Sequence, residues 1–128
     1  MNGTMMDTPL HLQHCRPLRG AEHRLEPHQS ETLMSLLDGW QLSEHGQALF
    51  KIVPFENYHQ TMAFVNALAF IAHREDHHPD LEVGYSRCVV KFTTHSVNAG
   101  KGGLSENDFI CAAKIESLVE GRREPASH

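Results

Sequence analysis

The stretch "NYHQTMAFVNALAFIAHREDHHPD", residues 57–80, holds the strongest helix signal of the chain together with its stop signal. Asn57 and, three residues later, Gln60 resemble a capping box, which predicts that a helix begins there. Apolar residues then recur at helical spacing and form an arc wider than one contact with a sheet requires. Pro79 keeps the preceding residue out of the helical conformation, so we expect the helix to end within residues 75–77.

Shorter elements are predicted on both sides of this helix. "SETLMSLLDGW", residues 30–40, predicts a helix with Ser30 as its N-cap. Residues 40–55 and 81–95 each predict two strands joined by a turn, and residues 105–121 predict a last helix. The order is therefore helix, two strands, helix, two strands, helix. It predicts an α+β fold, with a four-stranded antiparallel sheet and helices packed on one face.

The chain has 128 residues, which fits one domain that can bury its own core. Its first part contains scattered charge and no sustained apolar period. We therefore expect an irregular or flexible N-terminal arm over residues 1–28, a single domain over 29–120 and a frayed tail over 121–128. The arm carries histidines and a cysteine, but their spacing fits no standard zinc pattern.

Composition excludes several classes of protein. The net charge is −5 and the basic residues are scattered, so we expect no direct binding to nucleic acid. No apolar run approaches the roughly 20 residues of a membrane span, and the first residues do not resemble a secretory signal. The three cysteines are odd in number and show no CxxC spacing. These features predict a cytoplasmic protein without a disulfide framework.

The strand predicted within "ALFKIVPF", residues 48–55, is apolar on both faces. The long helix also has a wide apolar arc. A lone chain would expose one of these surfaces, and such patches usually mark interfaces. We therefore expect a homo-oligomer, either a homodimer or a homotetramer.

Histidines gather where the long helix ends. His77 and His78 lie at its C-terminus beside carboxylates, and both the helix dipole and the carboxylates favour imidazolium. Such a group can donate a proton near neutral pH. His95 ends a later strand, and a hairpin would bring it alongside the helix end. The three imidazoles would then converge with no obvious nucleophile among them, which favours proton transfer.

Two other interpretations of these histidines stay open. Helix-end histidines often act only as caps, and a strand-end histidine is often solvated. Alternatively, His73 and His77 share a helix face at a spacing that chelates zinc, with His95 or Glu75 completing the set. Against a metal, the pair straddles the helix end and the folded region has no second compact pair of ligands. We therefore predict no metal site.

A set of short motifs runs from the end of the long helix to the start of the last one. It comprises His77-His78-Pro79, Tyr85, Thr94-His95, Gly103-Leu104-Ser105 and Asp108. This set resembles the signature of the pterin-4a-carbinolamine dehydratases, and the similarity runs from about Ser30 to Val119. The stretches "FVNALAF", "VVKFTTHSV" and "GLSENDFICAAKIE" are similar to the bacterial members of that family.

The resemblance implies the same α+β sandwich and a reaction. The family dehydrates 4a-hydroxytetrahydropterin to quinonoid dihydropterin, which recycles the cofactor of aromatic amino acid hydroxylases, and it uses no metal or organic cofactor. Loss of water needs an acid for the departing hydroxyl and a base for a ring proton. The family's three active-site histidines fall on His77, His78 and His95. We expect His77 and His95 to carry the proton transfer and His78 to bind the substrate.

The substrate contacts are predicted from the same match. The family's aspartate falls on Asp108, which is also placed to act as a helix-start carboxylate. Where the family usually has an acidic residue, this chain has His73, and we expect Glu75 or Asp76 to supply the charge instead. The loop before "GLS" is longer than usual. The residues predicted to contact the pterin are Glu75, Asp76, Pro79, Thr94 and Asp108.

Two functions of other classes remain as alternatives. Animal relatives act as dimerisation cofactors for a homeodomain transcription factor, so a protein-binding module is one of them. Nothing basic or zipper-like in this sequence favours it. The other is a metal-dependent hydrolase that uses His73, His77 and His95.

Overall fold

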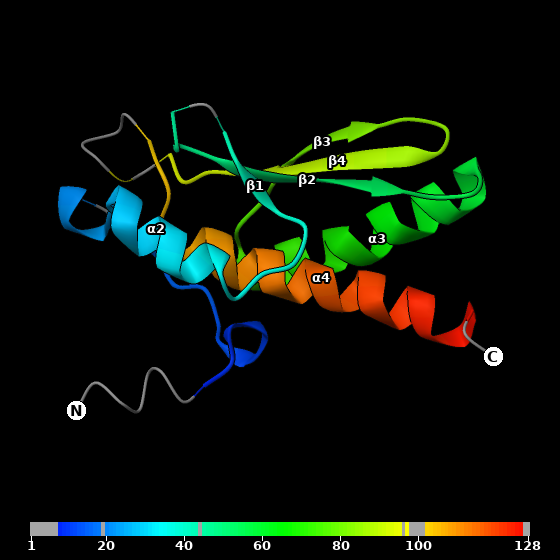
Figure 1. Ribbon diagram of the computed structural model, residues 1–128, viewed down its shortest axis with the longest axis horizontal. Coiled ribbons are helices and arrows are strands. Elements are labelled where there is room, and N and C mark those ends of the chain that lie inside the picture. The colour runs from blue at the N-terminus through cyan, green and yellow to red at the C-terminus, as the bar shows by residue number, and fades with distance from the viewer. Residues whose placement is uncertain (1–7, 19, 44, 96, 98–101, 127–128) are drawn as a thin grey trace.

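The computed structural model describes residues 8–18, 20–43, 45–95, 97 and 102–126 of the chain. Two 3₁₀ turns come first, and three α-helices and four strands follow (Figure 1). These elements are η1 (Leu10–Leu12), η2 (Ala21–His23), α2 (Pro27–Met34), β1 (Gln41–Leu42), β2 (Leu49–Pro54), α3 (Tyr58–Glu75), β3 (Asp80–Val83), β4 (Arg87–Phe92) and α4 (Glu106–Ala126).

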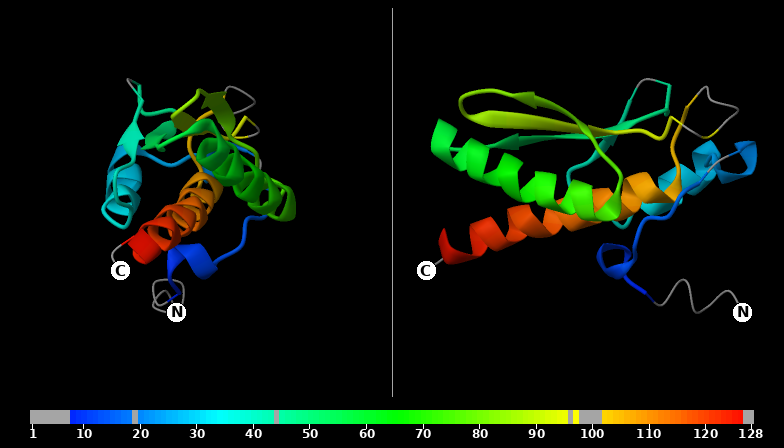
Figure 2. Two further views of the ribbon diagram at one scale, coloured as in Figure 1. Left: turned by 90° about the vertical axis from the view of Figure 1, so that its right-hand side faces the viewer. Right: turned by 180° about the vertical axis from the view of Figure 1, so that it is seen from behind.

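The strands form one antiparallel sheet in the order β1-β2-β4-β3. All three α-helices lie on the same face of it, and α4 lies between α2 and α3 when the molecule is seen end-on (Figure 2). The predicted α+β class and order of elements are therefore confirmed. None of the described helices is long and apolar enough to cross a membrane.

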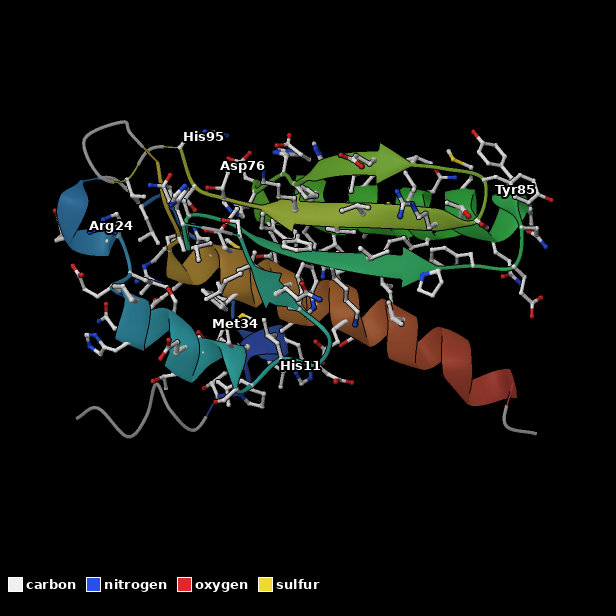
Figure 3. All side chains as sticks on the ribbon, turned by 45° about the horizontal axis from the view of Figure 1, so that its top comes forward. His11, Arg24, Met34, Asp76, Tyr85 and His95 are labelled. Atoms are coloured by element: carbon white, nitrogen blue, oxygen red, sulfur yellow. The ribbon has the colours of Figure 1, made fainter. Side chains whose placement is uncertain are left out.

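The core lies between the helices and the inner face of the central strands β2 and β4. Leu49 pairs with Phe92 and Val53 pairs with Cys88, and all four side chains are buried. Residues on the other face of β2 are not covered in this way, since Ile52 is 50% exposed. The strand that is apolar on both faces thus has one face on the core and one face open within this chain (Figure 3).

Helix α3 begins and ends as its sequence predicts. The Asn57 side chain accepts a hydrogen bond of 2.9 Å from the Gln60 N–H, and the helix ends at Glu75. Asp76 then takes up a left-handed conformation with φ 55° and ψ 42°. It is the one non-glycine residue with positive φ in the described part of the chain. The turn lets the His77 N–H donate to the Ala72 carbonyl at 3.2 Å, as in a Schellman cap.

Helix α2 differs from the prediction at both ends, since it also ends earlier, at Met34, and α4 differs at its C-terminal end. The expected N-cap at Ser30 is wrong: α2 begins at Pro27, and Ser30 is a buried residue inside it. Proline suits the first helical position because its φ is already helical and it has no N–H to satisfy. The Gln29 side chain also accepts a hydrogen bond of 2.8 Å from the Glu26 N–H. At the other end of the chain, α4 continues to Ala126, into the segment predicted as a tail.

Part of the predicted N-terminal arm lies against α4. Turn η1 packs on the side of α4 that faces away from the sheet (Figure 1). The Lys114 ammonium donates a hydrogen bond of 2.8 Å to the His11 carbonyl. Leu18 is buried. The arm is irregular in conformation, but it contributes to the packed structure.

We expect the two faces of β2 to respond differently to truncation. Leu49→Ala removes a fully buried side chain and should lower the free energy of unfolding by about 2–5 kcal/mol. Ile52→Ala, on the open face of the same strand, should change it by about 0.5 kcal/mol in the monomer. Urea unfolding at low protein concentration measures both values. Equal costs for the two variants would show that this division of the faces is wrong.

Candidate functional site

A hollow of about 510 Å³ lies where α3 ends and α4 begins. Three parts of the chain line it. They are the arm segment Cys15–Leu18, the end of α3 and the turn after it (Arg74–His77), and the pair Thr94 and Asn107. Its volume is within the range of small-molecule sites.

The carboxylate of Asp108 organises the residues beneath this hollow. One of its oxygens lies 2.6 Å from His77 Nε2. The other accepts hydrogen bonds from the Thr94 hydroxyl at 2.8 Å and from the Ser105 N–H at 3.0 Å. The side chain of Asp108 is fully buried, and that of His77 is 12% exposed. A buried carboxylate with this many donors is held in one orientation and stabilises positive charge on its histidine.

Local backbone geometry brings these residues together. The Asp108 N–H donates to the Ser105 carbonyl at 3.1 Å, so Ser105 and Asp108 form the first turn of α4. Thr94 and Gly103 exchange backbone hydrogen bonds of 2.8 and 3.1 Å, which fix the end of β4 beside that turn. The φ of Gly103 is 153°, a conformation that favours glycine. Asp108 is therefore the predicted helix-start carboxylate, and its fully buried side chain contacts His77 without lining the hollow.

The orientation of the His77 ring defines which of its nitrogens contacts Asp108. The ring stacks on Phe92 with centroids 5.8 Å apart and planes 6° from parallel. Since Nε2 faces a carboxylate that can only accept, we assign the proton to Nε2 in the neutral ring. The lone pair is then on Nδ1. His77 is thus held in one orientation by Asp108 on one side and by Phe92 on its face.

The other two predicted histidines lie elsewhere. His95 is exposed and lines a second hollow of about 370 Å³ together with Lys91 and Thr93. Thr94 points to the first hollow and His95, the next residue, to the second. His78 is exposed and lines neither hollow. His95 and Asp76 nevertheless lie at the same end of the sheet (Figure 3).

The remaining predicted residues divide in the same way. Asp76 is exposed and lines the first hollow, whereas Pro79 is half-buried and lies outside it. Tyr85, from the motif set, lies at the opposite end of the sheet, where it stacks on Tyr58 (Figure 3). The structure therefore brings together His77, Thr94 and Asp108, with Asp76 at the same hollow.

Glu75 also lines the hollow, but its carboxylate is bound to the arm. The side chain is only 2% exposed. Its oxygens lie 2.8 Å from the Cys15 N–H, 3.0 Å from His14 Nδ1 and 3.8 Å from Lys114 Nζ. Burial opposes ionisation, but the Cys15 and His14 hydrogen bonds and the Lys114 charge outweigh it, so the pKa of Glu75 is lowered. A carboxylate with these partners is ionised, and its oxygens are already occupied by contacts within the protein.

The sequence did not predict the arm residues or Asn107 at this hollow. Asn107 precedes Asp108, and its side chain binds the Arg16 backbone in both directions, with Arg16 N–H to Oδ1 at 3.2 Å and Nδ2 to the Arg16 carbonyl at 2.6 Å. Such contacts use backbone groups, so they produce no periodic pattern of apolar residues in the sequence. In the described residues, no three His, Cys, Asp or Glu side chains are placed to share a metal ion.

The fold and this hollow define a small α+β protein in which a histidine paired with a buried carboxylate lines a hollow of small-molecule size. The chain belongs to the pterin 4 alpha carbinolamine dehydratase family, whose model matches residues 23–118. This confirms the family that the motifs indicated.

Individual relatives agree with that assignment. A Bdellovibrio bacteriovorus protein with the provisional name pterin-4-alpha-carbinolamine dehydratase is 58% identical over 107 residues, which are 84% of this chain and 88% of the relative. A Stenotrophomonas maltophilia protein of the same provisional name is 56% identical over 112 residues, 88% of this chain and 93% of the relative. The crystal structure of a Brucella melitensis transcriptional coactivator/pterin dehydratase superposes with a TM-score of 0.68 at 28% identity, covering 74% of this chain and 97% of that one.

The lowered pKa of Glu75 predicts a pH-dependent stability. The ionised form is bound in the folded state, so its stabilisation is present above the ordinary pKa of 4.5 and is lost as the pH falls through the lowered value. Glu75→Gln should therefore cost about 2 kcal/mol near neutral pH and progressively less in acid. The exposed Glu82→Gln is the matched control and should cost little at any pH. Thermal unfolding of the three proteins across the acid range would contradict this if the Glu75→Gln deficit stayed constant.

Proposed function

We propose that this protein dehydrates 4a-hydroxytetrahydropterin to quinonoid dihydropterin and water by histidine acid–base catalysis. The observation that carries the proposal is the His77–Asp108 pair at 2.6 Å beside a hollow of about 510 Å³. Membership of the family supports the substrate and the reaction type. In the cell, the reaction would recycle the pterin cofactor of aromatic amino acid hydroxylases in the cytoplasm.

The reaction needs two proton transfers. The bond between the ring carbon and the hydroxyl oxygen breaks, an acid gives the hydroxyl a proton so that it leaves as water, and a base removes a proton from a ring nitrogen. His77 is suited to be the base, because Nδ1 carries the lone pair and Asp108 stabilises the imidazolium that forms. His95 follows Thr94 in the chain and lines the second hollow, and we assign it as the acid from the motif match alone. No net proton is gained or lost.

The other predicted residues would bind the substrate. His78 follows His77 in the chain and is exposed to solvent, and Pro79 favours an extended backbone there, so we assign it to binding the polar edge of the pterin. Asp76 and Thr94 line the hollow itself. Asp108 acts through His77, as a positioning residue.

Replacing the histidines tests this division. His77→Ala or His95→Ala should lower kcat at least about tenfold, because each catalytic proton transfer is typically worth ~10²–10⁴ in rate. His78→Ala should raise KM more than it lowers kcat. The measurement is the accelerated decay of freshly made 4a-carbinolamine. The assignment is wrong if His78→Ala alone abolishes kcat while the other two variants stay near wild type.

Metal content separates this mechanism from a metal-dependent hydrolase. We expect the purified protein to contain no stoichiometric zinc and to keep its dehydratase activity in the presence of a chelator. Elemental analysis and the same decay assay measure both properties. About one tightly bound metal per chain, with activity lost on stripping and restored on addition, would favour the hydrolase.

We also propose that the chain forms a homodimer or homotetramer. The open face of β2, with Ile52 half exposed, and the exposed Phe70 of α3 support this. Sedimentation should give a mass of at least twice 14.4 kDa at micromolar concentration. A stable 14.4 kDa monomer under those conditions would exclude the assembly.

A protein-binding role is the second candidate. It is favoured by one observation, that the Brucella melitensis structure is described as a transcriptional coactivator as well as a pterin dehydratase. The decay assay decides between the two roles for this chain, since a binding module alone would not accelerate loss of water.

A further inference from the structure

The structure points to a further part of the site: we infer that the arm segment Cys15–Leu18 is a wall of the substrate site, and that Glu75 and Asn107 are positioning residues that hold it. The inference rests on the proposed function. The family match begins at residue 23, so this wall precedes the part of the chain that the family model describes.

Asn107 fixes the arm at the start of α4. Its amide exchanges two hydrogen bonds with the Arg16 backbone, at 3.2 and 2.6 Å, and the residue is 5% exposed. A side chain that binds both the N–H and the carbonyl of one residue sets the direction of the chain as well as its position. The next residue, Asp108, holds His77. The first turn of α4 therefore sets the arm and the proposed base at a fixed distance from each other.

Glu75 fixes the arm at the end of α3. Its carboxylate binds the Cys15 N–H and His14, and it lies two residues before His77. Lys114 of α4 lies 3.8 Å from the same carboxylate and donates to the His11 carbonyl. The arm is thus tied to both helices by buried charged groups. Breaking such a tie leaves a buried charge without its partner, so the fixed position of the arm is strongly favoured.

The arm would affect binding more than chemistry. It lines the hollow with Cys15 to Leu18, and the acid and base assigned above lie on other segments. A wall that contacts substrate and transition state alike contributes uniform binding, which changes KM and leaves kcat. Asp108, by contrast, acts on the base and would change kcat. The two kinds of residue are therefore separable by kinetics although they are neighbours in the sequence.

Two native cysteines report the position of the arm. Cys15 Sγ lies 3.3 Å from Cys111 Sγ of α4. A diazenedicarboxamide oxidant should join them: each thiol loses a proton and an electron, a sulfur–sulfur bond forms, and the oxidant's N=N bond is reduced to HN–NH. Peptide mapping should find Cys15 linked to Cys111 in the wild type. Failure to form this link would overturn the placement of the arm.

Kinetics of three variants test the wall. Glu75→Gln and Asn107→Ala each remove one or two hydrogen bonds and should raise KM roughly tenfold, with kcat changed less than about threefold. The exposed Glu82→Gln is the control and should match the wild type. The inference is overturned if KM is unchanged, or if kcat falls as much as kcat/KM. Circular dichroism verifies that each variant is folded.

A rescue experiment distinguishes release of the arm from a general destabilisation of the protein by a substitution. Oxidising Glu75→Gln should tie the arm down covalently through Cys15 and Cys111 and return KM towards the wild-type value. The same treatment of the double variant Glu75→Gln, Cys111→Ser should give no recovery. Equal behaviour of the two proteins would mean that the arm does not set KM.

Binding of a stable 7,8-dihydropterin separates this inference from the proposed reaction. Suppose that the wild type does not dehydrate the carbinolamine but binds dihydropterin, with an affinity that falls in Glu75→Gln and Asn107→Ala. The proposed reaction is then wrong, and the inference that the arm is a wall of the site is supported. If the wild type catalyses dehydration while neither KM nor dihydropterin affinity depends on these residues, the proposed reaction is supported and the inference about the arm is overturned.

Discussion

The hydrogen bonds of the Asp108 carboxylate are the constraint on which the site depends. Through His77, Thr94 and Ser105 they join the end of α3, the end of β4 and the start of α4. A fully buried carboxylate is costly unless every lone pair finds a donor, and here the donors come from three elements. If one of these elements moves, the buried carboxylate loses one of its hydrogen-bond donors. The ends of the three elements must therefore meet at one place.

A second buried carboxylate extends this arrangement to the N-terminal arm. Glu75 lies two residues from His77 and takes its partners from the arm and from α4. Between Glu75 and His77 the chain makes the left-handed turn at Asp76, which directs the two side chains to different partners. One histidine is in this way flanked by two fixed charges with separate tasks. The Asp108 carboxylate contacts the ring itself, and the Glu75 carboxylate binds the arm that lines the hollow.

Much of the fold could be predicted from the sequence, because periodicity reports which face of each element is buried. Every second residue of β4 is buried (Cys88, Val90 and Phe92), as periodicity requires of a strand with one face on the core, and the cap at Asn57 and the end of α3 were predicted correctly. The start of α2 was missed, since Ser30 resembles a cap while Pro27 fits the first helical position better. Both are local signals of similar strength, and a buried Ser30 depends on neighbours that lie far along the chain.

The sequence by itself determined the element order, the family and the cluster of histidines at the end of α3. Only the tertiary structure decided what these groups contact: that His77 pairs with Asp108, that His95 lines a different hollow, and that Glu75 is bound to the arm. The physical reason is the separation along the chain of the residues that interact. Helix and strand periods, caps and proline act over a few residues, whereas the Arg16–Asn107 contact joins groups 91 residues apart. Such contacts form between backbone and polar atoms once packing has fixed the helices, and no local pattern encodes them.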